Sequence, residues 1–397
     1  MKILHITGDS KWSGGGVVVE SLVRMALTRG WNVDVLTTDL RCQTAMKALG
    51  AGVVNLDVIW RDIQPLRDLM GLLRLRRYLK THSYDVVHTH TSKAGLVGRI
   101  AARLAGVPVV LHTVHGFAFH EQAQWRVIAF YTVLERIAAC FCDAIVTVSR
   151  YHREWALRLR MASEEKLRAI PNGINEARFC SDSIGADFRK RVGAAPDCLV
   201  VVTQGRLAEG KGLEYLLSAI PRLKSQLRQD LKVVIVGDGP LRESLEALAS
   251  GLGVSDSVVF DGFQQDIGSI LAGADVIALP TLREGLSISL LEAMAAGKVI
   301  VATDIGSNLE ATDNGACAWM IPTKDADALA GAIEHVSGNP ETARVRGQAA
   351  RSHFLANYSE SGMTEAYDGL YRELSLRKGL SRASAKPLME QVAEAQQ

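Results

Sequence analysis

Short apolar runs alternate with helix-length amphipathic stretches along almost the whole chain, and this alternation restricts the fold more than any other feature. Parallel strands need a long crossover connection, which is usually a helix, so the pattern predicts βαβ units in parallel sheets. Five strands are expected in each half of the chain. They are KILHIT, NVDVLTT, DVVHTH, VVLHTVH and DAIVTVS, and then CLVVVTQG, LKVVIVGDG, SVVFDGF, DVIALP and KVIVAT.

A break in the alternation divides the chain. The segment RAIPNGINEARF, residues 168–179, contains Pro171, Asn172 and Gly173, which together are typical of a turn. A chain of 397 residues is also too long for one ordinary core. We therefore expect an α/β protein with two doubly wound parallel-sheet domains that face each other across a cleft. The expected boundaries are residues 1–172, residues 173–357, a helix over 358–378 that can cross back to the first domain, and a polar tail over 379–397.

Composition excludes several classes of protein. The chain has 45 lysines and arginines against 43 aspartates and glutamates, so no overall field favours nucleic acid as a partner. The six cysteines form neither a CxxC pair nor a zinc-binding spacing, and we interpret them as reduced thiols of a cytoplasmic protein. The start of the chain lacks the pattern of a secretory signal. No apolar run approaches the roughly 20 residues that span a bilayer, so any membrane contact is expected to be peripheral.

Two turns could hold a phosphate. Gly14, Gly15 and Gly16 follow the first predicted strand, where backbone amides without neighbouring Cβ atoms can approach a diphosphate. The stretch is not GxGxxG and no Walker lysine follows, which disfavours a dinucleotide or P-loop site. In the second turn, TQGRLAEGKG, Arg206 and Lys211 could neutralise a pyrophosphate. Glycines that only serve a turn, and basic residues that are only solvated, remain the alternatives.

Two glutamates stand eight residues apart in REGLSISLLEAMAAGK. Glu284 in a turn and Glu292 in the early turns of a helix could both face a ligand at the helix N-terminus. In the other interpretation, Glu292 completes a capping box opened by Ser289, and Glu284 is a solvated loop residue. The segment alone does not decide between them.

Taken in order, GRLAEGKG, VVFDGFQQDI and ADVIALPTLREGLSISLLEAMAAGKVIVAT resemble motifs of glycosyltransferase family 4, over nearly the whole chain. The family comprises retaining nucleotide-sugar transferases of GT-B fold, with two Rossmann-like domains. The resemblance implies that Glu284 holds hydroxyls of the transferred sugar and that Glu292 holds the ribose hydroxyls of the nucleotide. It also implies a set of donor-binding residues around the phosphates, formed by Arg206, Lys211, the loop amides of Gly285, Leu286 and Ser287, and the glycines Gly15 and Gly16.

His115, in HTVHGFAFH, matches the histidine that this family places at the reacting sugar. The resemblance implies front-face transfer, in which the leaving phosphate accepts the proton of the incoming hydroxyl and His115 orients a substrate. A core histidine satisfied by the backbone is the alternative. The other histidines of this region, His5, His88, His90, His112 and His120, are interpreted as structural. No acidic cluster has the spacing of a Mg²⁺ site, so we expect a metal-independent enzyme without a cofactor.

The stretch HTHTSKAGLVGRIAARLAGVPVVLHTVHGFAFH, residues 88–120, resembles family members that build bacterial surface polysaccharides. This implies a UDP-sugar donor and a saccharide acceptor carried on a polyprenyl diphosphate. A sugar-nucleotide 2-epimerase on the same fold and a catalytically silent sugar-nucleotide sensor are the alternatives.

Two segments could contact a membrane surface. PLRDLMGLLRLRRYLKTH, residues 65–82, mixes leucines with basic residues, and WRVIAFYTVLERIAACF, residues 125–141, is largely apolar. An ordinary domain helix and a core helix are the respective alternatives. The basic residues of the first segment are Arg67, Arg74, Arg76, Arg77 and Lys80.

Overall fold

A computed structural model of the chain describes residues 1–8, 14–60, 64–179 and 185–380. The chain forms two compact units, which we treat separately. The first comprises Met1–Val148, Arg153–Ile170 and the segment that begins at Thr364, and the second comprises Ser149–His152 and Pro171–Met363.

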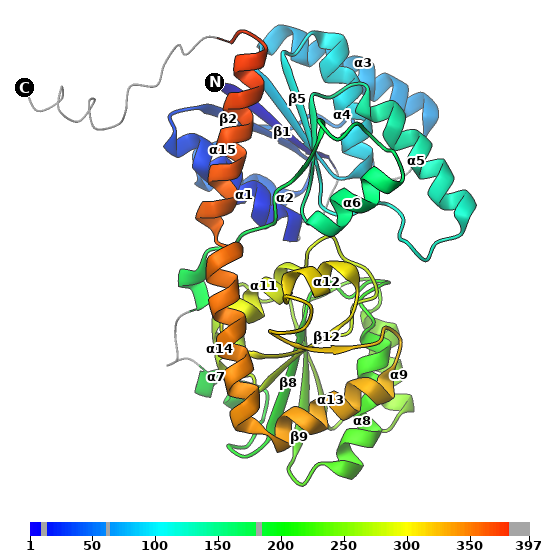
Figure 1. Ribbon diagram of the computed structural model, residues 1–397, viewed down its shortest axis with the longest axis vertical. Coiled ribbons are helices and arrows are strands. Elements are labelled where there is room, and N and C mark those ends of the chain that lie inside the picture. The colour runs from blue at the N-terminus through cyan, green and yellow to red at the C-terminus, as the bar shows by residue number, and fades with distance from the viewer. Residues whose placement is uncertain (9–13, 61–63, 180–184, 381–397) are drawn as a thin grey trace, which may run out of the picture. The chain divides into compact units, whose positions relative to one another are not determined.

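The first unit contains a parallel sheet in which seven strands of the described chain pair in the order β3-β2-β1-β4-β5-β6-β7 (Figure 1). Its central strands are buried along their whole length, as expected for a parallel sheet covered on both faces. The strands are β1 (Lys2–Gly8), β2 (Asn32–Thr37), β3 (Gly52–Val54), β4 (Val86–His90), β5 (Val109–Val114), β6 (Ala144–Thr147) and β7 (Leu167–Ala169).

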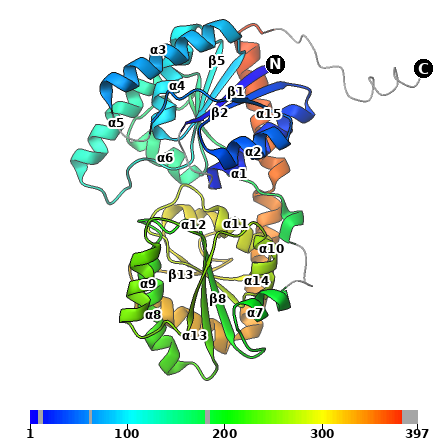
Figure 2. The same cartoon turned by 180° about the vertical axis from the view of Figure 1, so that it is seen from behind.

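Helices cover both faces of this sheet. Two helices, α1 and α2, lie on one face together with the C-terminal helix α15, while α3, α4 and α5 lie on the other face (Figures 1 and 2). The helices of this part of the chain are α1 (Gly14–Thr28), α2 (Leu40–Ala48), α3 (Pro65–His82), α4 (Ser92–Ala105), α5 (Trp125–Ala139), α6 (Arg150–Arg158) and α15 (Glu360–Arg377).

The second unit contains a parallel sheet with the order β10-β9-β8-β11-β12-β13 among its described strands. This is the order of a Rossmann sheet, and the first six strands of the other sheet follow the same order. The predicted fold class, two doubly wound domains in one chain, is confirmed. The strands are β8 (Leu199–Gln204), β9 (Leu231–Val236), β10 (Val258–Gly262), β11 (Val276–Leu279), β12 (Val299–Thr303) and β13 (Trp319–Ile321).

The apolar faces of α8, α9 and α13 form one core layer of the second unit with the strands beneath them. On the other side, α14 packs against α11 and β12 (Figure 2). The helices are the 3₁₀ helix η1 (Glu176–Phe179), α7 (Gly185–Arg191), α8 (Leu213–Gln226), α9 (Arg242–Gly251), α10 (Ile267–Gly273), α11 (Ile288–Ala295), α12 (Gly306–Ala311), α13 (Ala326–Gly338) and α14 (Pro340–Asn357).

The structure departs from the sequence prediction at short elements. It contains three strands that were not predicted, β3, β7 and β13, and each has only three residues, too few for a recognisable apolar run. The ten predicted strands correspond to the remaining ones. The predicted long helix over 358–378 corresponds to α15, whereas most of the predicted polar tail, residues 381–397, lies outside the described residues.

The predicted turn at Pro171–Gly173 lies where the chain enters the second unit. Just beyond it, Ile174 N donates to Tyr358 O at 3.1 Å, so this segment pairs with the one that precedes α15. A Cβ on Gly173 would lie 2.1 Å from the carbonyl oxygen of Ser359. The close approach of the two backbones explains why a glycine stands here.

Candidate active site

The second sheet has a topological switch point between β8 and β11, because the chain continues from these neighbouring strands toward opposite edges of the sheet. Ligands of doubly wound folds bind at such a point, at the carboxyl ends of the strands. Gln204 is the last residue of β8, Glu284 follows β11, and Glu292 lies on α11, the next helix. The fold therefore brings the carboxylates of the sequence motif to the edge of the sheet where a ligand is expected.

Lys211 and Glu284 form an ion pair at this edge, between Lys211 Nζ and Glu284 Oε1. Thr281 Oγ1 lies 3.4 Å from the same carboxylate oxygen. Both charged side chains are only partly exposed. The structure thus brings together two residues that the resemblance assigns to the phosphates and to the sugar, and in the free protein each charge neutralises the other.

Two glycines shape the loop that carries Lys211. Gly210 and Gly212 have φ values of +85° and +66°, which other residues rarely adopt. A Cβ on Gly212 would lie 2.0 Å from the carbonyl oxygen of Pro280. The Gly210 carbonyl accepts a hydrogen bond of 3.0 Å from Thr281 Oγ1. The lysine loop is therefore held against the segment that follows β11, which leads to the glutamate.

Glu292 is partly buried and accepts a hydrogen bond of 2.7 Å from Gln204 Nε2. Burial raises the pKa of Glu292 from 4.5 to about 7, while the positive charge of Arg178 acts in the opposite direction. Gln204 Oε1 is buried and has no hydrogen-bond partner in the described part of the chain. Sequence reasoning used Gln204 only to mark the end of a strand. Its place at the carboxyl end of the first strand of a sheet is the signal that could have identified it.

The capping box that the sequence allowed is wrong. Ser287, not Ser289, is the N-cap residue of α11, and its side chain accepts from Leu290 N at 3.4 Å. Ser289 Oγ instead donates to the carbonyl of Gln204 at 3.0 Å and so fixes the helix to the end of β8. Glu292 lies beyond the first turn, where it cannot take part in a cap.

Three other predicted donor residues of the second unit lie in the loops that follow β8 and β11. Arg206 follows β8, and within the described residues its side chain has no hydrogen bond or ion pair. The loop of Gly285 and Leu286 is fixed at both ends, because Asn172 Nδ2 donates to Leu286 O at 3.3 Å and Ser307 Oγ donates to the carbonyl before Gly285 at 3.1 Å. Neither Asn172 nor Ser307 was predicted as a site residue from the sequence.

In the first unit, the predicted residues His115 and Gly15 lie side by side. A Cβ on Gly15 would be 3.4 Å from His115 Cγ, so the glycine packs against the imidazole ring. Gly15 and Gly16 belong to the first turn of α1, which corrects the predicted glycine turn, while residues 9–13 before it lie outside the described residues. Amides in the first turn of a helix have no partner within the helix, so they remain available to an anion.

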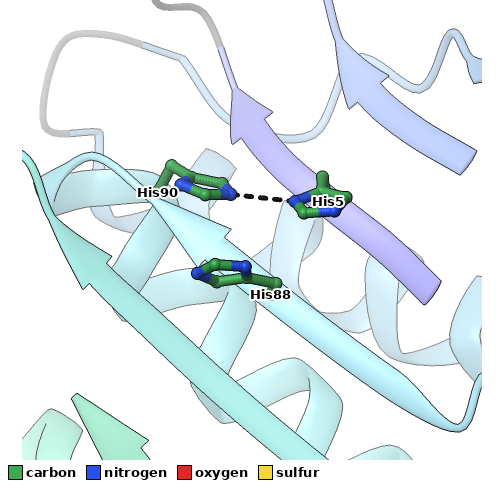
Figure 3. Close-up of side chains that lie close together, drawn as sticks. All are labelled: His5, His88 and His90. Atoms are coloured by element: carbon green, nitrogen blue, oxygen red, sulfur yellow. Dashed lines mark hydrogen bonds between the residues drawn. The ribbon is translucent and has the colours of Figure 1, made fainter. Parts of the chain in front are cut away.

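His115 is joined to a row of buried histidines. His115 Nε2 lies 3.0 Å from His90 Nδ1, and His90 Nε2 lies 3.0 Å from His5 Nδ1; Figure 3 shows the second of these bonds. Burial lowers the pKa of His115 to about 4 and that of His5 to about 3, so both rings are neutral at pH 7. Since its partner is a side chain, His115 is not the backbone-satisfied core histidine of the alternative interpretation.

Within the part of the chain that the structure describes, His5, His88 and His90 form the one group of possible metal ligands whose donor atoms lie within 4.8 Å of one another (Figure 3). His88 Nδ1 is 2.6 Å from the Tyr371 hydroxyl, and His88 Nε2 is 2.8 Å from Thr113 Oγ1. Both nitrogens of His90 face other histidines. A metal ion would have to replace these hydrogen bonds, so the group is better described as a hydrogen-bonded cluster.

The outer surface of the first unit carries exposed apolar side chains. On α5, Trp125 is 73% exposed and Phe130 is 56% exposed, and the exposed Val133 and Ile137 share the helix face of Phe130. The helix is therefore not a core helix. On α3, exposed leucines precede exposed basic residues, but Arg76 Nε donates to Leu104 O and so serves the fold. No helix of the described chain is long and apolar enough to cross a bilayer.

The arrangement suits a ligand with negative charge and several hydroxyl groups. Cations and helix N-termini can bind a phosphate, and carboxylates accept hydrogen bonds from hydroxyls.

Comparison with known proteins indicates a glycosyltransferase. Residues 12–178 match a family model described as Glycosyltransferase Family 4, and residues 186–353 match one described as Glycosyl transferases group 1.

Two bacterial relatives have similar sequences over most of their length. UDP-Gal:alpha-D-GlcNAc-diphosphoundecaprenol alpha-1,3-galactosyltransferase of Escherichia coli is 30% identical over 321 residues, which are 80% of this chain and 83% of that protein. The putative glycosyltransferase EpsD of Bacillus subtilis is 32% identical over 305 residues, 75% of this chain and 79% of that protein.

Solved structures share the fold at lower identity. HepE of Anabaena, in complex with UDP and glucose, has a TM-score of 0.81 at 19% identity and covers 94% of this chain and 100% of that chain. WaaG, a glycosyltransferase involved in lipopolysaccharide biosynthesis, has a TM-score of 0.71 at 18% identity and covers 93% of this chain and 99% of that chain.

Proposed function

This chain belongs to glycosyltransferase family 4 and has the GT-B fold, and from that membership we propose that it moves a hexose from a UDP-sugar to a saccharide on a polyprenyl diphosphate, with retention of configuration. The product is a precursor of a cell-surface polysaccharide. One observation supports this most strongly: the Lys211–Glu284 and Gln204–Glu292 pairs meet at the switch point of one Rossmann sheet. The E. coli relative, named for UDP-Gal and a diphosphoundecaprenol acceptor, supports the choice of donor and acceptor.

The donor-site roles follow the charges of the side chains. Lys211 and Arg206 bind the diphosphate, since both are cations and Arg206 has no other partner in the described chain. Glu284 binds hydroxyls of the transferred sugar, and Glu292 binds the ribose. The loop amides of Gly285, Leu286 and Ser287 also bind the phosphates. In the first unit, we assign the α1 amides of Gly15 and Gly16 to the diphosphate and His115 to the reacting sugar.

Front-face transfer needs no protein nucleophile. The bond between the anomeric carbon and the β-phosphate oxygen breaks while the acceptor oxygen approaches the same face, and the acceptor proton passes to the departing phosphate. Lys211, Arg206 and the helix amides stabilise the negative charge that develops on that phosphate. These groups occupy the role that a divalent cation has in other transferases, so we propose a metal-independent reaction.

Purified protein should consume a UDP-hexose only when a lipid-linked acceptor is present. UDP-galactose, UDP-glucose, UDP-N-acetylglucosamine and GDP-mannose are each incubated with GlcNAc-diphosphoundecaprenol, and release of nucleoside diphosphate is measured with and without EDTA. We expect release from one UDP-sugar, unchanged by EDTA, and NMR of the product should show an α-linkage. A β-linkage would contradict retention, and loss of activity with EDTA would contradict metal independence.

The same panel tests the alternative functions. A 2-epimerase would convert a UDP-sugar without any acceptor, and a silent sensor would bind a nucleotide sugar without converting it. Release of nucleoside diphosphate that depends on the acceptor would therefore favour transfer over both alternatives.

We further propose that the enzyme is cytoplasmic and contacts the inner face of the membrane through α3 and α5. Basic residues on α3 attract anionic lipid, by about 1 kcal/mol for each lysine or arginine near the membrane surface. The exposed side chains of Trp125 and Phe130 on α5 can enter the membrane interface. Such contact would bring the enzyme to the membrane that holds the lipid-linked acceptor.

Reversing two charges on α3, Arg74→Glu with Arg77→Glu, should lower co-sedimentation with phosphatidylglycerol vesicles by roughly tenfold or more at low salt. The matched control reverses Arg344 and Arg377, which are exposed on α14 and α15. An equal loss in the control would mean that only net charge matters, and unchanged binding of the α3 variant would overturn the proposal.

A further inference from the structure

We propose that His90 and His5 are positioning residues which fix the proton of His115 on Nδ1, so that this atom offers a hydrogen bond to a substrate oxygen. The inference rests on the proposed role of His115 at the reacting sugar. It follows from a row of three imidazoles, His5–His90–His115, in which consecutive rings are 3.0 Å apart at their nearest nitrogens. Among the residues that the structure describes, neither end of the row, His5 Nε2 or His115 Nδ1, has a hydrogen-bond partner, and both atoms are buried.

The number of N–H protons in the row determines which tautomers the three rings can adopt at the same time. Three neutral imidazoles carry three N–H protons on six nitrogens, and each of the two internal bonds uses one of them. The third proton must therefore lie at one end. Either all three rings are Nδ1–H tautomers and His115 offers a donor, or all three are Nε2–H tautomers and His5 carries the unpaired N–H. The tautomer of each ring thus depends on the other two.

The rings remain neutral because they are buried. Burial is the largest cause that lowers the pKa of each of the three, and for His90 the neighbouring histidines lower it further. Accepting a proton from the substrate would place a positive charge inside this cluster. His115 is accordingly suited to donating a hydrogen bond and not to removing a proton, which agrees with transfer in which the leaving phosphate takes the proton.

The two ends of the row differ in depth. His5 is completely buried in β1, whereas His115 is partly exposed at the end of β5, beside Gly15 at the N-terminal turn of α1. Buried N–H groups without a partner are rarer in proteins than unsatisfied acceptors. Either arrangement leaves one buried N–H without a partner in the described chain, but only the one on His115, whose side chain is partly exposed, can be reached by a substrate oxygen. The arrangement with the bare nitrogen on His5 and the N–H on His115 is therefore favoured.

His88 differs from the three histidines of the row. It lies in the same cluster, with its ring centroid 4.1 Å from that of His90, but it belongs to a different set of hydrogen bonds. Its nitrogens contact the Tyr371 hydroxyl and Thr113 Oγ1, and Thr113 Oγ1 lies 3.0 Å from the Tyr367 hydroxyl. This second set fastens α15 to the sheet, so His88 is a structural residue and its ring does not reach His115.

The test uses the full chain labelled with ¹⁵N-histidine, and long-range ¹H–¹⁵N NMR that reports which ring nitrogen is protonated. We expect His5, His90 and His115 to be Nδ1–H tautomers in the free protein and after addition of UDP. In His90→Phe, His115 loses the partner of its Nε2 and should shift toward the Nε2–H form. In His88→Phe, which removes an equally buried ring, His115 should keep its Nδ1–H signal.

Kinetics give a second readout. His90→Phe should lower kcat of sugar transfer about tenfold to a hundredfold while the donor KM changes little, as expected for a misplaced catalytic contact. His88→Phe should lower the melting temperature and leave kcat within about twofold of the original. His90→Gln, whose amide can accept from His5 and donate to His115, should recover part of the lost kcat.

Several results would overturn the proposal: an Nε2–H or charged His115 in the unmodified protein, a His88→Phe effect equal to that of His90→Phe, or a metal ion found at the cluster by elemental analysis. The NMR measurement needs no substrate, so it decides about the tautomers even if no sugar donor is turned over. A failure of the proposed function is therefore distinguishable from a failure of this inference.

Discussion

Lys211→Met should lower kcat/KM for the sugar donor by about 10²- to 10³-fold, the usual cost of losing one preorganised group that stabilises developing charge. Methionine keeps most of the side-chain length and removes only the cation. Because the Lys211–Glu284 pair is partly exposed, its loss should change the free energy of unfolding by no more than about 1 kcal/mol. The loss of activity should therefore appear without a large change in urea stability.

A matched control for this change is available on α8. Lys224 also pairs with a carboxylate, Asp256, but on the exposed surface, and Lys224→Met should leave kcat/KM unchanged. Glu284→Gln should lower kcat/KM by a similar factor to Lys211→Met, since it removes an ionised acceptor for sugar hydroxyls. If Lys211→Met and Glu284→Gln both retained full transfer, the assignment of the donor site would be wrong.

Glu292→Gln should raise the donor KM by about 10²-fold at pH 8, because two hydrogen bonds to a charged group are worth about 1.5–3 kcal/mol each and a neutral amide keeps only part of this. With a pKa of about 7, the Glu292 carboxyl becomes protonated below that pH and loses its charge. The donor KM of the unmodified protein should therefore rise as the pH falls from 8 to 6, whereas that of Glu292→Gln should stay nearly flat.

Stability should respond to pH in the opposite sense. Because the folded pKa of Glu292 is raised, the folded state holds this proton more tightly than the unfolded chain, whose value is 4.5. The stabilisation is fully present below pH 4.5 and is lost as the pH rises through 7. Melting temperatures of Glu292→Gln and the unmodified protein should thus diverge between pH 5 and pH 8, with the variant gaining. Glu341→Gln, an exposed pair member on α14, should show no such divergence.

Long apolar runs made the fold predictable from the sequence, because a continuous apolar run such as VVVT or VVIV is typical of a strand buried on both faces of a parallel sheet. Strands of three residues could not be predicted, since their pairing depends on neighbouring strands that are present only in the folded sheet. The capping box failed for a related reason: Ser287 and Ser289 stand two residues apart, and which one caps α11 depends on where the helix begins, not on the composition of the turn.

The candidate site was predictable where the residues are charged and follow a strand, as for Lys211 and Glu284. Gln204, Asn172 and Ser307 were not identified, because an amide or hydroxyl has a function here only through the carboxylate or carbonyl that it contacts. The same holds for His90. Its part in the histidine row depends on two neighbouring strands coming into register, which no local pattern encodes.

The segment that begins at Thr364 completes the first unit, although Pro171–Met363 of the second unit is synthesised before it. Tyr371 and Tyr367 provide hydroxyls to His88 and Thr113, which precede them by 283 and 254 residues. While the chain emerges from the ribosome, the face of the first sheet that carries His88 and Thr113 therefore lacks the helix that covers it. Final folding of the first unit is consequently linked to synthesis of α15, and premature termination before this helix should leave that unit, and not only the missing segment, dependent on chaperones.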